Sequence, residues 1–260
     1  MQNSLLNYRV IGNGYPVLFL HGFLESETMW DYLDLGNLDF QSIFIDLPGH
    51  GKSLNTDDGE PSIEFMTSKV KELIEFLAIS NFSVVGHSMG GYVALSVKEM
   101  FSKAKDKGNR QCEKVVLLNS NFWEDSDSKK SDRLRVADIV SKNRLLFIRE
   151  AIPNLFVSKD VCNDQIIHLI EEASRIDKHA IIYATLAMRK RADKTSLIAK
   201  QPEDFLVVQG VLDSIIPMNI MMQKTNGIPV HIKCLENVGH MAHIESAAKV
   251  KEILADFLIG

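Results

Sequence analysis

The decisive stretch of this sequence is Val84-Val85-Gly86-His87-Ser88-Met89-Gly90-Gly91-Tyr92. It places a Gly-x-Ser-x-Gly pattern between a β-branched run that predicts a strand and a segment with the apolar spacing of a helix. A serine on such a sharp turn needs glycines two positions away on each side, because a Cβ at residue 86 or 90 would collide with the crossing backbone. We therefore expect Ser88 at the end of a strand and at the N-terminus of a helix, where free N–H groups favour a negative charge. A glycine-rich turn without chemistry is the alternative interpretation.

Strand and helix patterns alternate along the rest of the chain. Short β-branched and aromatic runs predict strands at Val17–Leu20, Ser42–Asp46, Phe82–Val85, Lys114–Leu118, Phe205–Val208 and Val230–Cys234. Apolar residues with helical spacing predict helices at Ile63–Leu77, Tyr92–Lys103 and Ala247–Leu258. This alternation predicts an α/β fold, in which helices cover both faces of a mostly parallel sheet.

The alternation breaks between about residues 121 and 200, where apolar residues keep helical spacing and no strand pattern is found. We expect a core made of residues 1–120 and 201–260, with residues 121–200 inserted between two strands as a helical cap. On the active-site side of the sheet such an insertion forms a lid, and a helical layer that only covers the core is the alternative.

Composition and charge exclude several functions. The chain has 260 residues, 45% of them hydrophobic, and a formal net charge of −5 with acidic and basic residues interspersed. We expect no nucleic-acid partner, because no broad cationic surface is available to neutralise phosphates. The densest basic stretch, from Lys129 to Arg135, predicts a solvated helix face more readily than a binding patch.

The sequence also indicates where the protein is found. No apolar run approaches the roughly 18 residues of a membrane span, and the first seven residues lack the charged and apolar regions of an export signal. Three widely spaced cysteines, Cys112, Cys162 and Cys234, suit neither a disulfide framework nor a zinc site. We expect a cytoplasmic protein with a small-molecule substrate and no membrane partner.

A serine nucleophile needs a base, and the base needs a carboxylate that fixes its tautomer. When serine stands on a strand-to-helix turn, the acid and then the histidine follow it along the chain. Asp213 lies a few residues beyond the strand predicted at Phe205–Val208, and His240 follows Gly239 after the last predicted strand. We therefore predict a catalytic triad of Ser88, Asp213 and His240. The alternatives are a turn-capping role for Asp213, and His243 as the base, which we interpret as a structural neighbour.

Backbone N–H groups complete the predicted site. A tetrahedral intermediate needs two donors from different loops to stabilise its oxyanion. The N–H group of Met89 directly follows the nucleophile, and that of Phe23 follows the His21-Gly22 turn at the end of an early strand. We expect these two groups to form the oxyanion hole, although the His-Gly turn has a purely structural alternative.

With these residues assembled, the chain resembles the α/β-hydrolase superfamily, and within it the small serine hydrolases with a helical cap. The segments that carry the resemblance are His21–Phe23, Asp46–Ser53, Gly86–Gly91, Gly210 with Asp213 and Pro217, and Gly239-His240 with Glu245. The resemblance implies esterase-like chemistry without a metal or an organic cofactor. Ser88 stands where the epoxide hydrolases and haloalkane dehalogenases of this superfamily carry Asp, which argues against both activities. Met241 stands where relatives that cleave carbon–carbon bonds tend to carry Trp.

We expect hydrolysis of a small carboxylic ester through an acyl-enzyme. An apolar acyl or alcohol group is indicated by the apolar residues Phe122, Trp123, Phe147, Leu155 and Phe156. The segment from His21 to Trp30 is also similar to the menaquinone-pathway lyases of the superfamily, which use the same three residue types. That alternative requires a cationic pocket, for which the candidates are Arg144, Arg149, Arg189 and Arg191. A ligand receptor on the same fold is a further alternative, and the sequence sets neither the substrate nor the oligomeric state.

Overall fold

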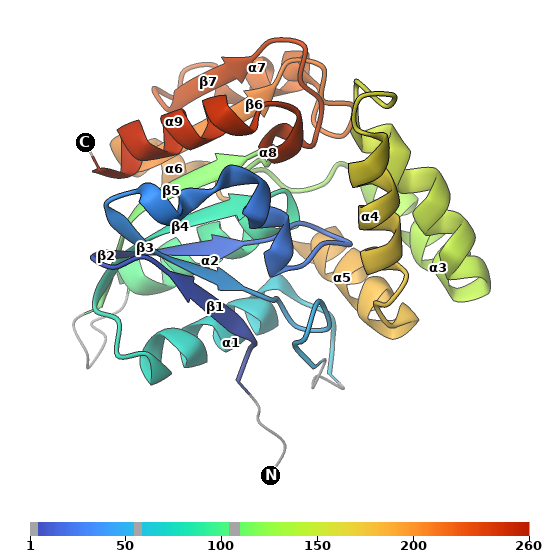
Figure 1. The fold of residues 1–260 in the computed structure, drawn as a ribbon, viewed down its shortest axis with the longest axis horizontal. Coiled ribbons are helices and arrows are strands. Elements are labelled where there is room, and N and C mark those ends of the chain that lie inside the picture. The colour runs from blue at the N-terminus through green and yellow to red at the C-terminus, as the bar shows by residue number, and fades with distance from the viewer. Residues whose placement is uncertain (1–4, 55–58, 104–109, 260) are drawn as a thin grey trace.

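The computed structural model describes residues 5–54, 59–103 and 110–259, and its framework is a seven-stranded sheet in the order β1-β3-β2-β4-β5-β6-β7 (Figure 1). The strands are β1 (Tyr8–Ile11), β2 (Tyr15–Leu20), β3 (Phe40–Ile45), β4 (Asn81–His87), β5 (Gln111–Leu118), β6 (Phe205–Gly210) and β7 (His231–Leu235). Among the strands of the described residues, only β1 and β3 pair in antiparallel fashion. The predicted α/β fold with a mostly parallel sheet is confirmed, whereas β1 was not predicted from the sequence.

Helices cover both faces of the sheet. Alternate residues of a strand point to opposite faces, so a single strand can pack against helices on both sides. In β2, Leu18 and Leu20 pack in one apolar cluster with α1 (Ile63–Phe76) and α2 (Met89–Lys103). Val17 and Phe19 pack in a second cluster with the 3₁₀ helix η1 (Glu27–Leu33) and α9 (Ala247–Ile259). Figure 1 shows α1 at the bottom of the view and α9 in its upper part. The helices of the core are α1 (Ile63–Phe76), α2 (Met89–Lys103), α7 (Met218–Thr225), α8 (Ala242–Glu245) and α9 (Ala247–Ile259), with the short 3₁₀ helices η1 (Glu27–Leu33) and η2 (Leu35–Asn37).

The predicted core helices lie close to their observed positions. Helix α1 begins where the apolar stripe begins, because the Ser62 side chain accepts a hydrogen bond from the Phe65 N–H group and caps the first turn. Helix α2 starts three residues before the predicted Tyr92, immediately after Ser88. The nucleophile candidate therefore sits directly between β4 and α2, as the glycine pattern requires.

In the described residues between β5 and β6, all the regular secondary structure is helical. It contains α3 (Asp127–Ala151), η3 (Ile152–Leu155), α4 (Asn163–Ala173), α5 (Lys178–Lys190), α6 (Thr195–Lys200) and η4 (Pro202–Asp204). Figure 1 shows α3, α4 and α5 grouped at one side of the sheet. Their inner faces form an apolar cluster of their own, which includes Val140, Ile148 and Ile181 and is joined by Leu24 and Met241 from the core. Among the helices that the structure describes, none is long and apolar enough to cross a membrane.

Candidate active site

Ser88 occupies a strained turn between β4 and α2. Its φ angle is 48°, in the left-handed region that residues with a side chain rarely adopt. A Cβ on Gly86 would lie 2.4 Å from the Gly90 carbonyl oxygen, and one on Gly90 would lie 2.2 Å from the carbonyl oxygen of Leu20. Both glycines are therefore required by close backbone approach, and the turn has the geometry that the sequence predicts.

The structure brings Ser88, His240 and Asp213 into one hydrogen-bonded chain. His240 lies in the loop between β7 and α8, where its Nε2 atom is 2.9 Å from the Ser88 Oγ atom. Its Nδ1 atom is 2.8 Å from Oδ2 of Asp213, in the loop after β6. All three residues stand at the carboxyl ends of parallel strands, so the sheet places segments that are distant in sequence at one edge.

Asp213 accepts several hydrogen bonds in addition to its interaction with His240. Its oxygens also accept hydrogen bonds from the N–H groups of Ile215 (2.8 Å) and Ile216 (3.0 Å) and from the side-chain amides of Asn119 (3.0 Å) and Gln209 (3.0 Å). Burial acts to raise the pKa of Asp213, but the charge and hydrogen bond of His240, with these donors, lower it to about 2. An ionised Asp213 keeps the proton of His240 on Nδ1 and leaves Nε2 free to accept a proton from Ser88.

The loop that carries His240 is fixed by Glu245. The Glu245 carboxylate accepts a hydrogen bond from the Gly239 N–H group at 2.8 Å and another from Val157 at 2.8 Å. The N–H group of His240 donates to the carbonyl oxygen of Leu155 at 2.9 Å. These contacts join the histidine loop to the segment that follows α3.

The two predicted oxyanion donors lie in the neighbourhood of Ser88. Met89 is fully buried and is the first residue of α2, so its N–H group has no acceptor one turn earlier in the helix. Phe23 lines the same cavity as Ser88. A Cβ on the preceding Gly22 would lie 2.3 Å from a Glu25 carboxylate oxygen, which explains the glycine at this turn. The role of both N–H groups as oxyanion donors stays a prediction.

A second buried carboxylate–imidazole pair lies beside the first. His87 Nδ1 is 2.8 Å from Oε2 of Glu25, and His87 Nε2 is 3.0 Å from the carbonyl oxygen of His240. A carbonyl oxygen only accepts hydrogen bonds, so Nε2 of His87 carries a proton. The same Glu25 oxygen accepts a hydrogen bond from the Gly22 N–H group at 2.7 Å, and the pKa of Glu25 is lowered to about 2, so the ionised carboxylate only accepts and Nδ1 donates to it. His87 is therefore an imidazolium that donates to Glu25 and to the backbone of His240.

The pKa values of the second pair agree with this assignment. Burial acts to lower the pKa of His87, but attraction to Glu25 and the hydrogen bond with it outweigh burial and raise it. Burial acts to raise the pKa of Glu25, and the charge and hydrogen bond of His87 nevertheless lower it to about 2. The sequence predicts packing or hydrogen bonding of His87 under the turn, but its pairing with Glu25 was missed.

His243 lies behind this pair as a neutral side chain. It is fully buried, and its Nε2 atom is 3.7 Å from Oε1 of Glu25. Burial, followed by the charge of His87, lowers the pKa of His243 to about 3. Ligand atoms of Glu25, His87 and His243 lie within 4.8 Å of one another, the spacing of a possible metal site. Both nitrogens of His87 are already engaged, however, so an ion would have to break the ion pair.

Ser88 and His240 open into a cavity of about 300 Å³ between the core and the inserted helices. Its apolar lining includes Phe23, Val136, Phe147, Leu155, Met188, Ile215 and Met241. Of the apolar residues that the sequence offered for a substrate pocket, Phe147 and Leu155 line this cavity, while Phe122 and Phe156 are buried elsewhere. The arrangement places a hydroxyl group and an imidazole at the wall of an apolar chamber of the size of a small organic molecule.

Asn119 and Gln209 belong to the site but were not predicted from the sequence, although their positions in the chain indicate it. Asn119 directly follows the strand predicted at Lys114–Leu118, and Gln209 directly follows the one predicted at Phe205–Val208. Polar residues at the carboxyl ends of neighbouring parallel strands meet at the same edge of the sheet. Both amides there contact Asp213.

Several known proteins are similar to this chain in sequence and in fold. Residues 17–253 match the family model described as Alpha/beta hydrolase family. The chain is similar to the AB hydrolase superfamily protein YisY of Bacillus subtilis (strain 168), with 27% identity over 269 residues that cover 95% of this chain and 92% of that protein. It is 37% identical to the serine hydrolase-like protein of Homo sapiens over 185 residues, which cover 70% of this chain and 76% of that relative.

Among solved structures, a thermophilic esterase from Thermogutta terrifontis is similar, with a TM-score of 0.85 and 27% sequence identity. The similarity covers 98% of this chain and 93% of that chain. The resemblance inferred from the sequence is thereby confirmed, and the chain belongs to the alpha/beta hydrolase family.

Proposed function

We propose that the protein is a carboxylesterase-like serine hydrolase, which cleaves a small carboxylic ester through an acyl-enzyme on Ser88. The observation that carries the proposal is the hydrogen-bonded chain from Ser88 through His240 to Asp213, with distances of 2.9 and 2.8 Å, at the edge of an apolar cavity. These are the distances at which a base takes a proton from a nucleophile.

In the proposed mechanism, Nε2 of His240 takes the Ser88 proton while Oγ attacks the ester carbonyl carbon. The N–H groups of Phe23 and Met89 hold the resulting oxyanion, and loss of one such donor costs about 3 to 4 kcal/mol of transition-state stabilisation. His240 then gives its proton to the departing alcohol. Water hydrolyses the acyl-enzyme with His240 again as the base, and Asp213 stabilises the imidazolium in both steps.

The substrate is proposed to have an apolar part, because apolar side chains from both the core and the inserted helices line the cavity. The helices between β5 and β6 act in this proposal as the cap over Ser88. The esterase from Thermogutta terrifontis, at 27% identity over nearly the whole chain, supports ester chemistry. A cytoplasmic location is part of the proposal and rests on the three cysteines, each of which is a free thiol.

A lyase that uses the same three residues is the second candidate. None of the four arginines offered for its cationic pocket is among the residues that line the cavity. Arg144 donates to the Ile176 carbonyl oxygen, Arg189 donates to that of Lys130, Arg149 is exposed, and Arg191 pairs with Asp125. Two other cations, Lys129 and Arg133, do line it and are the observation that keeps this candidate.

The test is release of p-nitrophenolate from a series of short-chain p-nitrophenyl esters by the wild type and by Ser88→Ala. The control is Ser80→Ala, an exposed serine at the opposite end of β4. The proposal expects turnover by the wild type and by Ser80→Ala, and a loss of about a thousandfold or more in Ser88→Ala. If the wild type releases no phenolate from any ester, ester hydrolysis is rejected and the lyase becomes the leading candidate.

A further inference from the structure

The first turns of α3 bring charged residues to the catalytic cavity. Lys129, Asp132, Arg133 and Val136 lie on one face of the helix and line the cavity that contains Ser88. The sequence predicts a solvated face for the basic stretch from Lys129 to Arg135. That prediction is wrong for Lys129 and Arg133, whereas Arg135 is exposed and pairs with Asp132.

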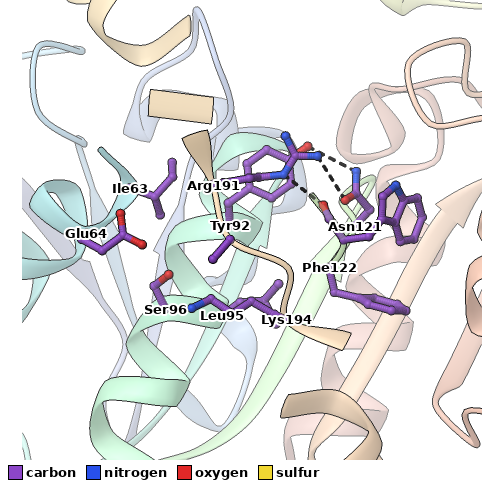
Figure 2. Close-up of a pocket in the computed structure, with 11 residues that line it drawn as sticks. Ile63, Glu64, Tyr92, Leu95, Ser96, Asn121, Phe122, Arg191 and Lys194 are labelled. Atoms are coloured by element: carbon purple, nitrogen blue, oxygen red, sulfur yellow. Dashed lines mark hydrogen bonds between the residues drawn. The ribbon is translucent and has the colours of Figure 1, made fainter. Parts of the chain in front are cut away.

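The neighbouring Arg133 and Arg191 already form ion pairs within the chain. Arg133 Nε lies 3.2 Å from Asp125, and Arg191 lies 2.7 Å from the same carboxylate. Figure 2 shows Arg191 lying over Tyr92 and reaching Asn121, and the centre of its guanidinium group is 4.1 Å from the centre of the Tyr92 ring. Together these contacts hold Arg191 in place at the adjoining cavity, outside the lining of the catalytic cavity.

Lys129 differs from these arginines. Within the part of the chain that the structure describes, its ammonium group has no hydrogen bond or ion pair, although the side chain is half-buried. Burial, and next the charge of Arg133, lower the pKa of Lys129, and the charges of Asp125 and Asp132 only partly offset them. An ammonium group that is partly removed from water gains most from an anion that enters the cavity.

The surroundings of Lys129 favour the same kind of ligand. A second cavity of about 790 Å³ adjoins the catalytic cavity and shares with it Tyr92, Lys129, Arg133 and Ile215. Five basic and three acidic side chains line this second cavity. The basic residues are Lys129, Lys130, Arg133, Arg191 and Lys224, and the acidic residues are Glu124, Asp125 and Asp127. A protein with a net charge of −5 thus has an excess of positive charge along this second cavity, which attracts anions.

We propose that the ester substrate also carries a carboxylate, and that Lys129 binds this carboxylate while the apolar wall of the cavity holds the rest of the molecule. The inference rests on the proposed ester hydrolysis at Ser88. It names the substrate class as a monoanionic ester with an apolar portion. Lys129 acts as a specificity residue, because it contacts a part of the substrate that does not react.

The experiment compares two pairs of esters that differ only in charge. One pair carries the charge on the acyl side: mono-p-nitrophenyl adipate and its neutral primary amide. The other carries it on the alcohol side: the butyrate ester of p-hydroxyphenylacetate and that of its primary amide. The measured quantity is the ratio of kcat/KM for the carboxylate to kcat/KM for the amide.

We expect a ratio of about ten for at least one pair in the wild type, the size of one charge-assisted hydrogen bond. Lys129→Met should reduce this ratio to about one, because it keeps the chain length and removes the charge, and Lys129→Arg should preserve the preference. The control is Lys142→Met, which removes an exposed lysine of the same helix that lines neither cavity and pairs with Asp138. It should leave the ratio unchanged.

The inference is overturned if the wild type hydrolyses the amide as fast as the carboxylate in both pairs, or if the preference survives in Lys129→Met. In either case hydrolysis that depends on Ser88 persists, so the proposed function stands. If neither pair and none of the simple esters is hydrolysed, the proposed function itself fails and the inference fails with it.

Discussion

Two buried carboxylate–imidazole pairs lie next to each other in this protein, and they differ in one contact. In both pairs a carboxylate oxygen lies 2.8 Å from Nδ1 of the histidine, Asp213 to His240 and Glu25 to His87. The Nε2 atom of His240 faces the Ser88 hydroxyl group, whereas that of His87 faces a carbonyl oxygen. A hydroxyl group can donate a proton and a carbonyl cannot. The Asp213–His240 pair is therefore suited to act as a base, whereas the Glu25–His87 pair is suited to remain charged.

The largest effect should come from removing the first imidazole. We expect His240→Gln to lower kcat for an ester substrate by about ten thousandfold or more, because Ser88 then has no group to take its proton. His168→Gln removes an exposed imidazole of α4 and serves as the control, with an expected rate close to that of the wild type. An ester hydrolysis rate in His240→Gln within tenfold of the wild type would contradict the assignment of the base.

The next effect should come from the carboxylate of the first pair. In Asp213→Asn the amide can donate to Nδ1, which places the imidazole proton on Nε2 and points it at Ser88. We expect kcat to fall by about a thousand- to ten-thousandfold. Steady-state kinetics measure the rate, and circular dichroism checks that the variant is folded. A folded variant with nearly normal kcat would show that Asp213 does not orient the base.

Breaking the second pair should act on stability. Glu25→Gln removes the charge that keeps the buried His87 protonated, so His87 gives up its proton or stays unpaired, and loss of one partner of a buried pair typically costs about 3 to 5 kcal/mol. Glu72→Gln breaks the exposed pair between Glu72 and Lys69 and should cost less than about 1 kcal/mol. Urea unfolding of both variants measures the difference. Equal losses would mean that the Glu25–His87 pair adds nothing beyond a surface contact.

The smallest effect is a dependence of stability on pH. The folded pKa of Glu25 and that of Asp213 are lowered to about 2, below the values of about 4 in an unfolded chain. A lowered folded pKa contributes stability that is present above the unfolded pKa and is lost as pH falls through the folded pKa. We expect the free energy of unfolding to fall between about pH 4 and pH 2, with a shallower slope in Glu25→Gln and in Asp213→Asn. Urea unfolding across this range measures the slopes, and equal slopes in all three proteins would contradict these lowered pKa values.

The two pairs also differ in how far the sequence predicts them. Ser88, Asp213 and His240 each stand beyond a predicted strand, so the parallel sheet alone indicates that they meet. Their hydrogen-bonded geometry was accordingly expected, while their catalytic roles remain predictions. Glu25 comes two residues after the His21–Phe23 segment, but no motif assigns it a role, and its partner His87 is 62 residues away in the chain. Only the three-dimensional path of the loop after β2 reveals their contact.

Elements with weak apolar patterns were the hardest to predict. Strand β1 is an edge strand of four residues, none of them fully buried, so it lacks the apolar run that marks the inner strands. In α3, apolar residues counted toward helical spacing, such as Leu145 and Leu146, are exposed at 42% and 52%. In the first turns of the same helix, the charged residues Lys129 and Arg133 line the cavity together with Val136. Spacing alone predicts that a helix forms, but not which of its faces meets the substrate.

The most direct test of the account is covalent labelling of the nucleophile. The protein would be treated with a fluorophosphonate, which reacts with activated serines, and the modified peptide would be identified by mass spectrometry. We expect one adduct, on Ser88 in the wild type, with labelling strongly reduced in His240→Gln and unchanged in His168→Gln. An adduct on another residue, or labelling of Ser88 at the same rate without His240, would contradict the claim that the Asp213–His240 pair activates Ser88.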